Sequence, residues 1–104
     1  MAGVLLAARP QCASWVIIVA GFEPAAHPKW QSMCSTQPAP LSVPALFCSG
    51  SADAFVPRER VELYASRFAT SAMHVHAGGH GIPTGTEFRA QLKAFVENLR
   101  TPAP

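Results

Sequence analysis

The sequence predicts a small α/β domain built around a parallel sheet. Two apolar runs and a third short segment, Ala72–Ala77, lead directly into glycine, and the first run is rich in β-branched residues. Runs of this kind are typical of strands that are buried on both faces of a parallel sheet. Helical periodicity follows the second and the third run. Because strands that alternate with helices lie parallel and are joined by right-handed crossovers, we expect about three parallel strands with flanking helices.

The N-terminal half is expected to hold one helix, one strand and one long loop. Gly3–Arg9 has the composition of a helix that Pro10 closes. Ser14–Ala20 is a continuous apolar run before Gly21 and predicts a strand. Glu23–Val43 carries four prolines and shows neither strand nor helix periodicity, so it predicts a loop with room for one short helical turn.

The C-terminal half alternates between strands and helices. Pro44–Gly50 and Ala72–Ala77 predict the second and the third strand. A helix entered at Pro57 lies between them, and a final helix runs from about Thr84 to Arg100, before Pro102. The apolar stripes of these helices consist of Val61, Tyr64, Ala65, Phe68 and Ala69 in the first and of Phe88, Leu92, Phe95, Val96 and Leu99 in the second.

The composition fits one globular domain and excludes several classes of partner. The chain has 104 residues and a mass of 11.0 kDa; 49% of its residues are hydrophobic and 13% are charged. This is enough apolar material for a packed core without disulfides. A net charge of +2 without a basic stripe gives no basis for nucleic-acid binding. The apolar run Trp15–Gly21 is too short to cross a membrane, and no cofactor is expected.

The cysteines and the first residues favour a reducing compartment. Cys12, Cys34 and Cys48 are odd in number and never form a CxxC pair. They therefore predict free thiols in a cytoplasmic protein. The N-terminal residues lack the basic segment and the cleavage pattern of a secretory signal, so we expect no signal peptide.

Chemically useful side chains follow the second and the third predicted strand. Asp53 lies in the loop after the second strand, and His80 lies in the loop after the third. Because ligands of open parallel sheets bind at the carboxyl ends of the strands, we expect both side chains at the same rim. There the Asp53 carboxylate can accept the Nδ1–H of the imidazole and stabilise the imidazolium that forms when Nε2 takes a proton. The pair amounts to two members of an acyl-transfer triad.

The segments around these residues resemble one family of serine hydrolases. GSADAFVP, residues 50–57, resembles the Gly-x-x-Asp-x-x-Val-Pro segment that carries the catalytic acid in α/β-hydrolases. HAGGHGIP, residues 76–83, resembles the His-x-Gly-Gly-His-x-Val-Pro segment of the FSH-type serine hydrolases. VIIVAGFEP, residues 16–24, is similar to a further strand and loop of that family, with Ala20 where a serine is usual. The resemblance implies the C-terminal part of an α/β-hydrolase fold that hydrolyses esters or related acyl compounds, with Asp53 as acid and His80 as base.

The nucleophile of such a hydrolase is not found in this sequence. The motif Gly-x-Ser-x-Gly occurs nowhere in the 104 residues, and Ser51 lacks the second glycine and precedes Asp53 by only two residues. The apolar helix near the N-terminus resembles the helix that follows the nucleophile in the family. We therefore expect residues 1–104 to form a single partial domain without the nucleophile-bearing half, inactive as an isolated chain.

Simpler interpretations of the same residues stay open. Asp53 also suits the position before a helix, where a carboxylate favours the positive end, and His80 also suits an ordinary loop. His74 and His76 share one strand face and form a His-x-His-x-x-x-His pattern with His80, which is a weak indication of a metal site. A half-exposed face of an edge strand explains these two histidines more simply, and we expect no metal.

Phe22 and Phe55 come shortly after strand ends and are candidates for binding the acyl group of a small-molecule substrate, although core packing explains them as well. An alternative to the hydrolase is a non-catalytic assembly module. Three strands leave two open edges, and Trp15–Ala20 is too hydrophobic to be left unpaired, so it predicts self-association. A related carboxylesterase or dienelactone-hydrolase-like enzyme, which differs in substrate and nucleophile, is a third possibility.

Overall fold

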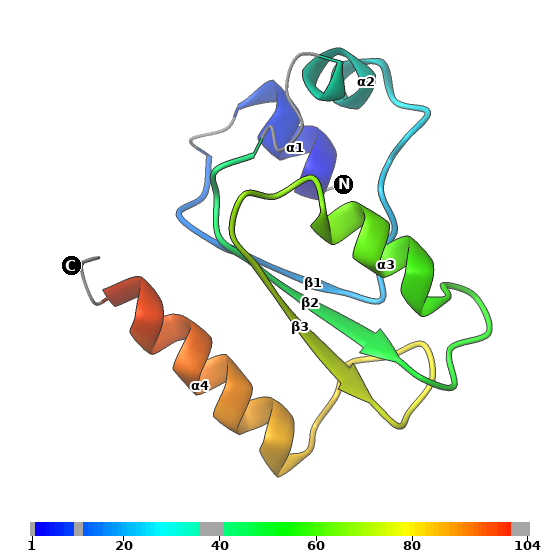
Figure 1. Cartoon of the computed structure of the whole chain (residues 1–104), viewed down its shortest axis with the longest axis vertical. Helices are drawn as coiled ribbons and strands as arrows, with labels where there is room; N and C mark the ends of the chain where they lie inside the picture. The colour runs from blue at the N-terminus through cyan, green and yellow to red at the C-terminus, as the bar shows by residue number, and fades with distance from the viewer. Residues whose placement is uncertain (1, 10–11, 36–40, 101–104) are drawn as a thin grey trace.

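A three-stranded parallel sheet in the order β1-β2-β3 forms the centre of the fold (Figure 1). The computed structural model describes residues 2–9, 12–35 and 41–100. The elements in chain order are α1 (Ala2–Ala8), β1 (Val16–Val19), α2 (Pro28–Cys34), β2 (Ala45–Gly50), α3 (Arg58–Ala65), β3 (Ser71–His76) and α4 (Thr86–Arg100). The predicted α/β class and the parallel direction of all three strands are confirmed. The helix stops predicted at Pro10 and Pro102 lie outside the described residues.

The central strand β2 is buried along its whole length, as its continuous apolar sequence predicts. Cys48 on this strand is fully buried, and burial raises the pKa of its thiol, so it acts as a small core residue. The first strand is shorter than the predicted run Ser14–Ala20. Pairing with β2 stops at Val19, because Ala20 turns into the left-handed region with φ of 52°.

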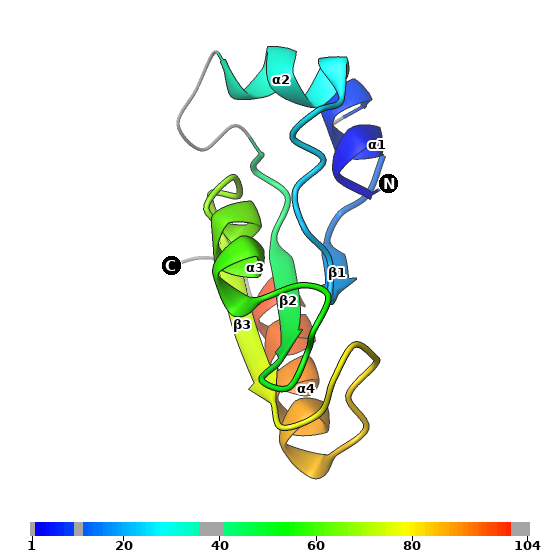
Figure 2. The same ribbon diagram turned by 90° about the vertical axis from the view of Figure 1, so that its right-hand side faces the viewer.

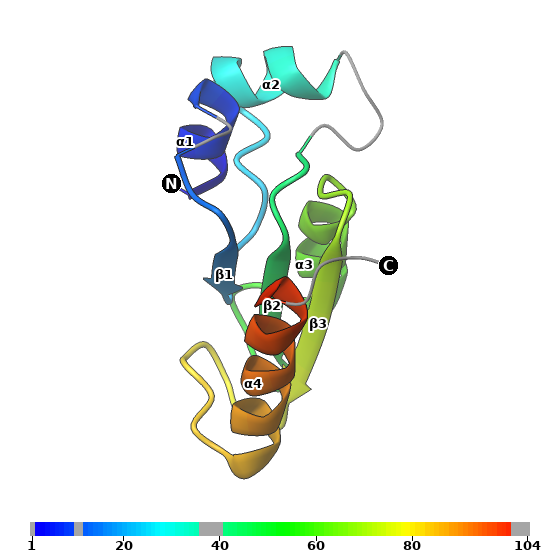
Figure 3. The same cartoon turned by 90° about the vertical axis from the view of Figure 1, so that its left-hand side faces the viewer.

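Helices cover both faces of the sheet, with α3 and α4 on opposite sides (Figures 2 and 3). Helices α1, α2 and α3 share one core with the sheet, in which the Tyr64 ring lies 5.5 Å from the Trp30 ring and 5.3 Å from the Phe47 ring. These edge-to-face contacts add to the hydrophobic burial. On the other face, Phe95 of α4 is buried. In the part of the chain that the structure describes, no helix is long and apolar enough to cross a membrane.

The predicted loop over Glu23–Val43 contains the seven-residue helix α2, which is longer than the one short turn that the sequence left room for. This helix starts at Pro28, and the imidazole of His27 caps it by accepting the amide N–H of Lys29 at 3.3 Å. Trp30 is only 1% exposed, so tertiary packing stabilises a helix whose sequence shows no period. Residues 36–40 of the predicted loop lie outside the described part of the chain.

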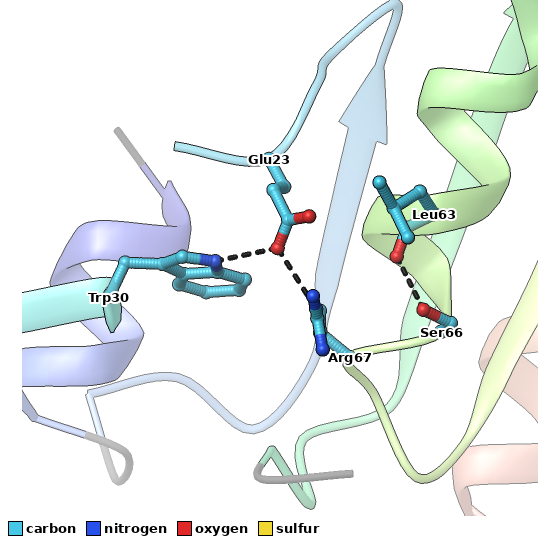
Figure 4. Close-up of polar contacts among 5 residues, drawn as sticks. All are labelled: Glu23, Trp30, Leu63, Ser66 and Arg67. Atoms are coloured by element: carbon cyan, nitrogen blue, oxygen red, sulfur yellow. Dashed lines mark hydrogen bonds and ion pairs between the residues drawn. The ribbon is translucent and has the colours of Figure 1, made fainter. Parts of the chain in front are cut away.

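A buried carboxylate fixes the loop after β1. One oxygen of Glu23 accepts the indole N–H of Trp30 at 2.7 Å and the Nε–H of Arg67 at 3.0 Å (Figure 4). The Glu23 side chain is 8% exposed, whereas that of Arg67 is 31% exposed. The contact joins segments 44 residues apart and connects α2 with the chain just after α3. It therefore holds the loop after β1 against the segment that follows α3, the helix that begins shortly after Asp53.

Candidate active site

The loops that follow β2 and β3 lie beside each other at the carboxyl end of the sheet (Figure 1). The amide of Ser51 donates to the carbonyl of His76 at 2.8 Å, and the amide of Ala52 donates to the carbonyl of Gly78 at 3.1 Å. These bonds extend the parallel pairing past the strand ends. They bring the carboxylate of Asp53 to the imidazole of His80, with Oδ2 and Nδ1 at 2.9 Å.

The Asp53 carboxylate is held by its own loop on the side away from His80. Oδ1 accepts the amide N–H of Phe55 at 2.7 Å and that of Val56 at 2.9 Å, as in an Asx-turn. The side chain is 1% exposed. The Val56 amide contributes most to lowering the pKa of Asp53, and the bonds from His80 and Phe55 lower it further against an opposing effect of burial. The carboxylate is therefore ionised at neutral pH.

The ionised carboxylate determines the tautomer of His80. A carboxylate only accepts hydrogen bonds, so the proton of the neutral imidazole must lie on Nδ1. The lone pair then lies on Nε2. With a side chain that is 45% exposed, His80 lines an open hollow formed by residues 74–88. A histidine in this tautomer, oriented by a buried carboxylate, is suited to take a proton from a hydroxyl.

Close contact between the two loops depends on a glycine at the end of β2. A Cβ at Gly50 would collide with the carbonyl oxygens of Gly78 and Gly79. The Gly50 carbonyl itself accepts the amide of Asp53 at 3.1 Å and closes the turn that carries the carboxylate. Any larger residue here must therefore move the Asp53 loop away from the loop of His80.

The two predicted substrate contacts differ in their relation to the pair. The Phe55 ring is 77% exposed and lies 5.5 Å from the His80 ring in an edge-to-face arrangement. The Phe22 ring is 50% exposed and carries the Arg60 guanidinium over its face at 4.3 Å. Neither ring belongs to the core. Ile82, which is 75% exposed and lines the same hollow as His80, adds a second apolar side chain near the imidazole.

The alternative metal pattern of three histidines is not assembled. His74 is buried, not half-exposed as predicted, and its Nδ1 lies 2.8 Å from the Gln91 side-chain oxygen under α4. The His76 ring stacks on the His74 ring at 6.3 Å, and its Nδ1 accepts the Gly78 amide at 3.1 Å. Among residues 2–9, 12–35 and 41–100, no three His, Cys, Asp or Glu side chains gather where a metal ion could bind.

The sequence reasoning identified Asp53 and His80 but missed residues that hold them. Gly50 and His76 lie inside the two quoted motifs, but neither contact leaves a periodic signal. The contact of Gly50 runs to the other loop, and that of the His76 side chain runs to the Gly78 amide of its own turn. No sequence pattern indicates Ile82, because an apolar residue in a glycine-rich loop can equally well pack in the core. The left-handed backbone of Ala20 had one local signal, which is the Gly21 that follows it.

Comparisons with known proteins agree with this geometry at the level of the family. A family model described as "Serine hydrolase (FSH1)" matches residues 3–92. A curated protein named "Esterase GA18864", from Drosophila pseudoobscura pseudoobscura, is 31% identical over 68 residues, which covers 58% of this chain. The chain spans only 24% of the length of that relative. No solved structure matches. The family match covers most of the chain, and the chain therefore belongs to the FSH1 serine hydrolase family.

Proposed function

We propose that this chain carries the acid and the base of a serine hydrolase that acts on carboxylic esters or related acyl compounds. The observation that supports this most strongly is the 2.9 Å contact between the buried Asp53 carboxylate and the half-exposed His80 imidazole. Family membership supports a hydrolase in general. The particular substrate and the roles of the two residues are our proposal.

In the proposed reaction, His80 Nε2 removes the proton from a serine hydroxyl while the serine oxygen forms a bond to the acyl carbon. The Asp53 carboxylate stabilises the imidazolium that results. The imidazolium then returns the proton to the oxygen of the leaving alcohol as the ester bond breaks. Water then takes the place of the alcohol: His80 Nε2 removes its proton while the water oxygen bonds to the acyl carbon. The imidazolium returns this proton to the serine oxygen as the bond between that oxygen and the acyl carbon breaks, which releases the acid.

We propose that the nucleophile comes from sequence outside these 104 residues, since no Gly-x-Ser-x-Gly motif is present. The chain alone is then expected to show no acyl-enzyme burst with p-nitrophenyl acetate in stopped-flow measurements. The His80→Ala variant should hydrolyse this ester at the same background rate. A burst that His80→Ala abolishes would contradict the proposal of an inactive isolated chain.

Complementation tests the catalytic roles directly. The chain is mixed with a polypeptide that holds the N-terminal part of an FSH1 family hydrolase, including its Gly-x-Ser-x-Gly motif. Hydrolysis is expected in the mixture and should fall by about 10⁴-fold with Asp53→Asn, which favours the wrong imidazole tautomer. Lys93→Ala, on the exposed face of α4, is the control and should leave the rate unchanged. Full activity with Asp53→Asn or His80→Ala would refute the assignment.

We propose that Phe55 and Phe22 contact the substrate. The exposure of Phe55 beside His80 supports its role, because an apolar ring that faces solvent next to a catalytic base can bind the apolar part of an ester. For Phe22 the support is its half-exposed ring. In the complementation assay, Phe55→Ala is expected to raise KM more for long than for short acyl chains. An equal effect on both would count against this contact.

A second candidate function is self-assembly through the open edge of β1. In the described part of the chain, β1 pairs only with β2, and no charged residue lies between Arg9 and Glu23 to discourage a further strand. We propose a second copy of this chain as the partner. Sedimentation at micromolar concentration should give a dimer, which Ile17→Lys disrupts and Leu63→Lys, on α3, does not. A monomeric wild-type chain would exclude this function.

We also propose a reducing, cytoplasmic compartment. Its support is that all three cysteines are free, with Cys12 exposed and Cys48 buried. Thiol titration of the chain isolated from its cells should find three reactive sulfhydryls after unfolding.

A further inference from the structure

The turn that presents His80 starts from a side chain that the proposed proton transfer does not use. His76 is the last residue of β3, and its Nδ1 accepts the amide N–H of Gly78 at 3.1 Å. One step further, the carbonyl of Gly79 accepts the amide of Gly81 at 3.0 Å. The backbone on both sides of His80 is therefore fixed locally, and the first of these bonds goes to an imidazole.

The same turn carries the carbonyl groups that hold the loop of Asp53. The carbonyls of His76 and Gly78 accept the amides of Ser51 and Ala52. The Gly78 amide belongs to the Ala77–Gly78 peptide, so its bond to His76 fixes the peptide directly before the one whose carbonyl accepts the Ala52 amide. The His76 side chain consequently constrains the turn at the point where the two loops meet.

The direction of this bond requires one tautomer of His76. A backbone amide only donates, so His76 Nδ1 must carry the lone pair and the proton of the neutral ring lies on Nε2. This is the reverse of His80, in which Nδ1 carries the proton. The two histidines of the HAGGH segment thus have opposite tautomers with different partners, and the His76 nitrogen that faces the turn is an acceptor.

We propose that His76 is a positioning residue for the Asp53–His80 pair. Its Nδ1 holds the Gly78 amide and so sets the turn that places the His80 imidazole against the carboxylate. The inference rests on the proposed function, because it assigns His76 a part in the same site. His76 does not touch the reacting atoms.

Two substitutions separate the acceptor from the bulk of the side chain. His76→Asn keeps an acceptor, because Asn Oδ1 takes about the place of imidazole Nδ1, whereas His76→Leu has similar size and no acceptor. The measurement is ¹⁵N NMR of the His80 ring in the full chain, with amide spectra of β1 and β2 as a check on folding. We expect His76→Asn to retain the Nδ1–H tautomer of His80, and His76→Leu to lower the ratio of paired to unpaired His80 roughly fivefold, the effect of one lost hydrogen bond on an equilibrium constant.

The same NMR measurement separates failure of this inference from failure of the proposed function. If the wild-type chain lacks the Nδ1–H tautomer of His80, the proposed function fails. If the wild-type chain has it and His76→Leu retains it, or if both variants lose it equally, the role of His76 is refuted. A further test uses the wild-type chain alone. NMR should detect a ¹⁵N–¹⁵N coupling across the hydrogen bond between the Gly78 amide and His76 Nδ1. Absence of this coupling overturns the inference.

Discussion

At the scale of single residues, the Asp53 carboxylate uses both of its oxygens. Oδ1 accepts two backbone amides and Oδ2 accepts the His80 imidazole, and all three bonds favour the ionised form. The pKa of Asp53 in the folded chain consequently lies below its ordinary value, chiefly because of the Val56 amide. Protonation of Asp53 therefore favours unfolding.

The first prediction concerns acid stability. Because the folded pKa of Asp53 is lowered, its contribution to stability is complete above the unfolded pKa of about 4 and is lost as the pH falls through the folded pKa. Asp53→Asn should be less stable than the wild type at neutral pH and should lose less of its free energy of unfolding on acidification. Urea unfolding at a series of pH values measures this. The control is Glu59→Gln, on the exposed side of α3, whose free energy of unfolding should change with pH as that of the wild type does. If the free energy of unfolding of Asp53→Asn fell on acidification as much as that of the wild type, the account would be contradicted.

The second prediction concerns Gly50. An added Cβ collides with the carbonyl oxygens of Gly78 and Gly79, so Gly50→Ala should lower the free energy of unfolding by about 1–3 kcal/mol, the usual cost of overpacking. It should also weaken the pairing of Asp53 with His80. Gly81→Ala is the control in the same loop, since a Cβ there meets nothing within 4 Å. Equal stability of the two variants would show that the loops can separate without cost.

At the scale of elements, the sequence determined the strands better than the connections. The three strands were predictable because continuous apolar runs before glycine have few alternatives. Asp53 and His80 could be placed together because parallel topology puts the carboxyl ends of neighbouring strands at one edge. Helix α2 is longer than the one short turn that the sequence left room for, because burial of Trp30 stabilises a segment without helical periodicity. The contact of Gly50 was missed because it depends on the relative position of two loops, which no local pattern encodes. The bond of the His76 side chain was missed because it depends on how its own turn folds back on the end of β3.

The third prediction concerns the connection between elements that Glu23 makes. Glu23→Ala leaves the indole N–H of Trp30 buried without its acceptor, which should cost about 1–3 kcal/mol of stability. Arg58→Ala breaks the exposed ion pair with Glu62 and should cost less than about 0.5 kcal/mol. Thermal unfolding compares the two. If Glu23→Ala lost as little stability as Arg58→Ala, the contact of Glu23 with Trp30 and Arg67 would not anchor the loop after β1.

At the scale of the whole molecule, one end of the sheet carries the Asp53–His80 pair, while the β1 edge has no partner among the described residues. Both features are consistent with our proposal that a nucleophile from outside these 104 residues completes the site. If the N-terminal polypeptide of the complementation assay pairs with the β1 edge, it excludes a second copy of this chain there. The dimer and the complemented enzyme are then expected to compete.

The central claim is that a buried acid fixes the proton of an exposed imidazole. Long-range ¹⁵N–¹H NMR of the His80 ring in the wild-type chain and in Asp53→Asn measures where that proton lies. For the neutral form of the ring we predict the proton on Nδ1 in the wild type and on Nε2 in the variant, whose side-chain amide donates to Nδ1. A wild-type ring protonated on Nε2, or a tautomer that Asp53→Asn leaves unchanged, would contradict the account.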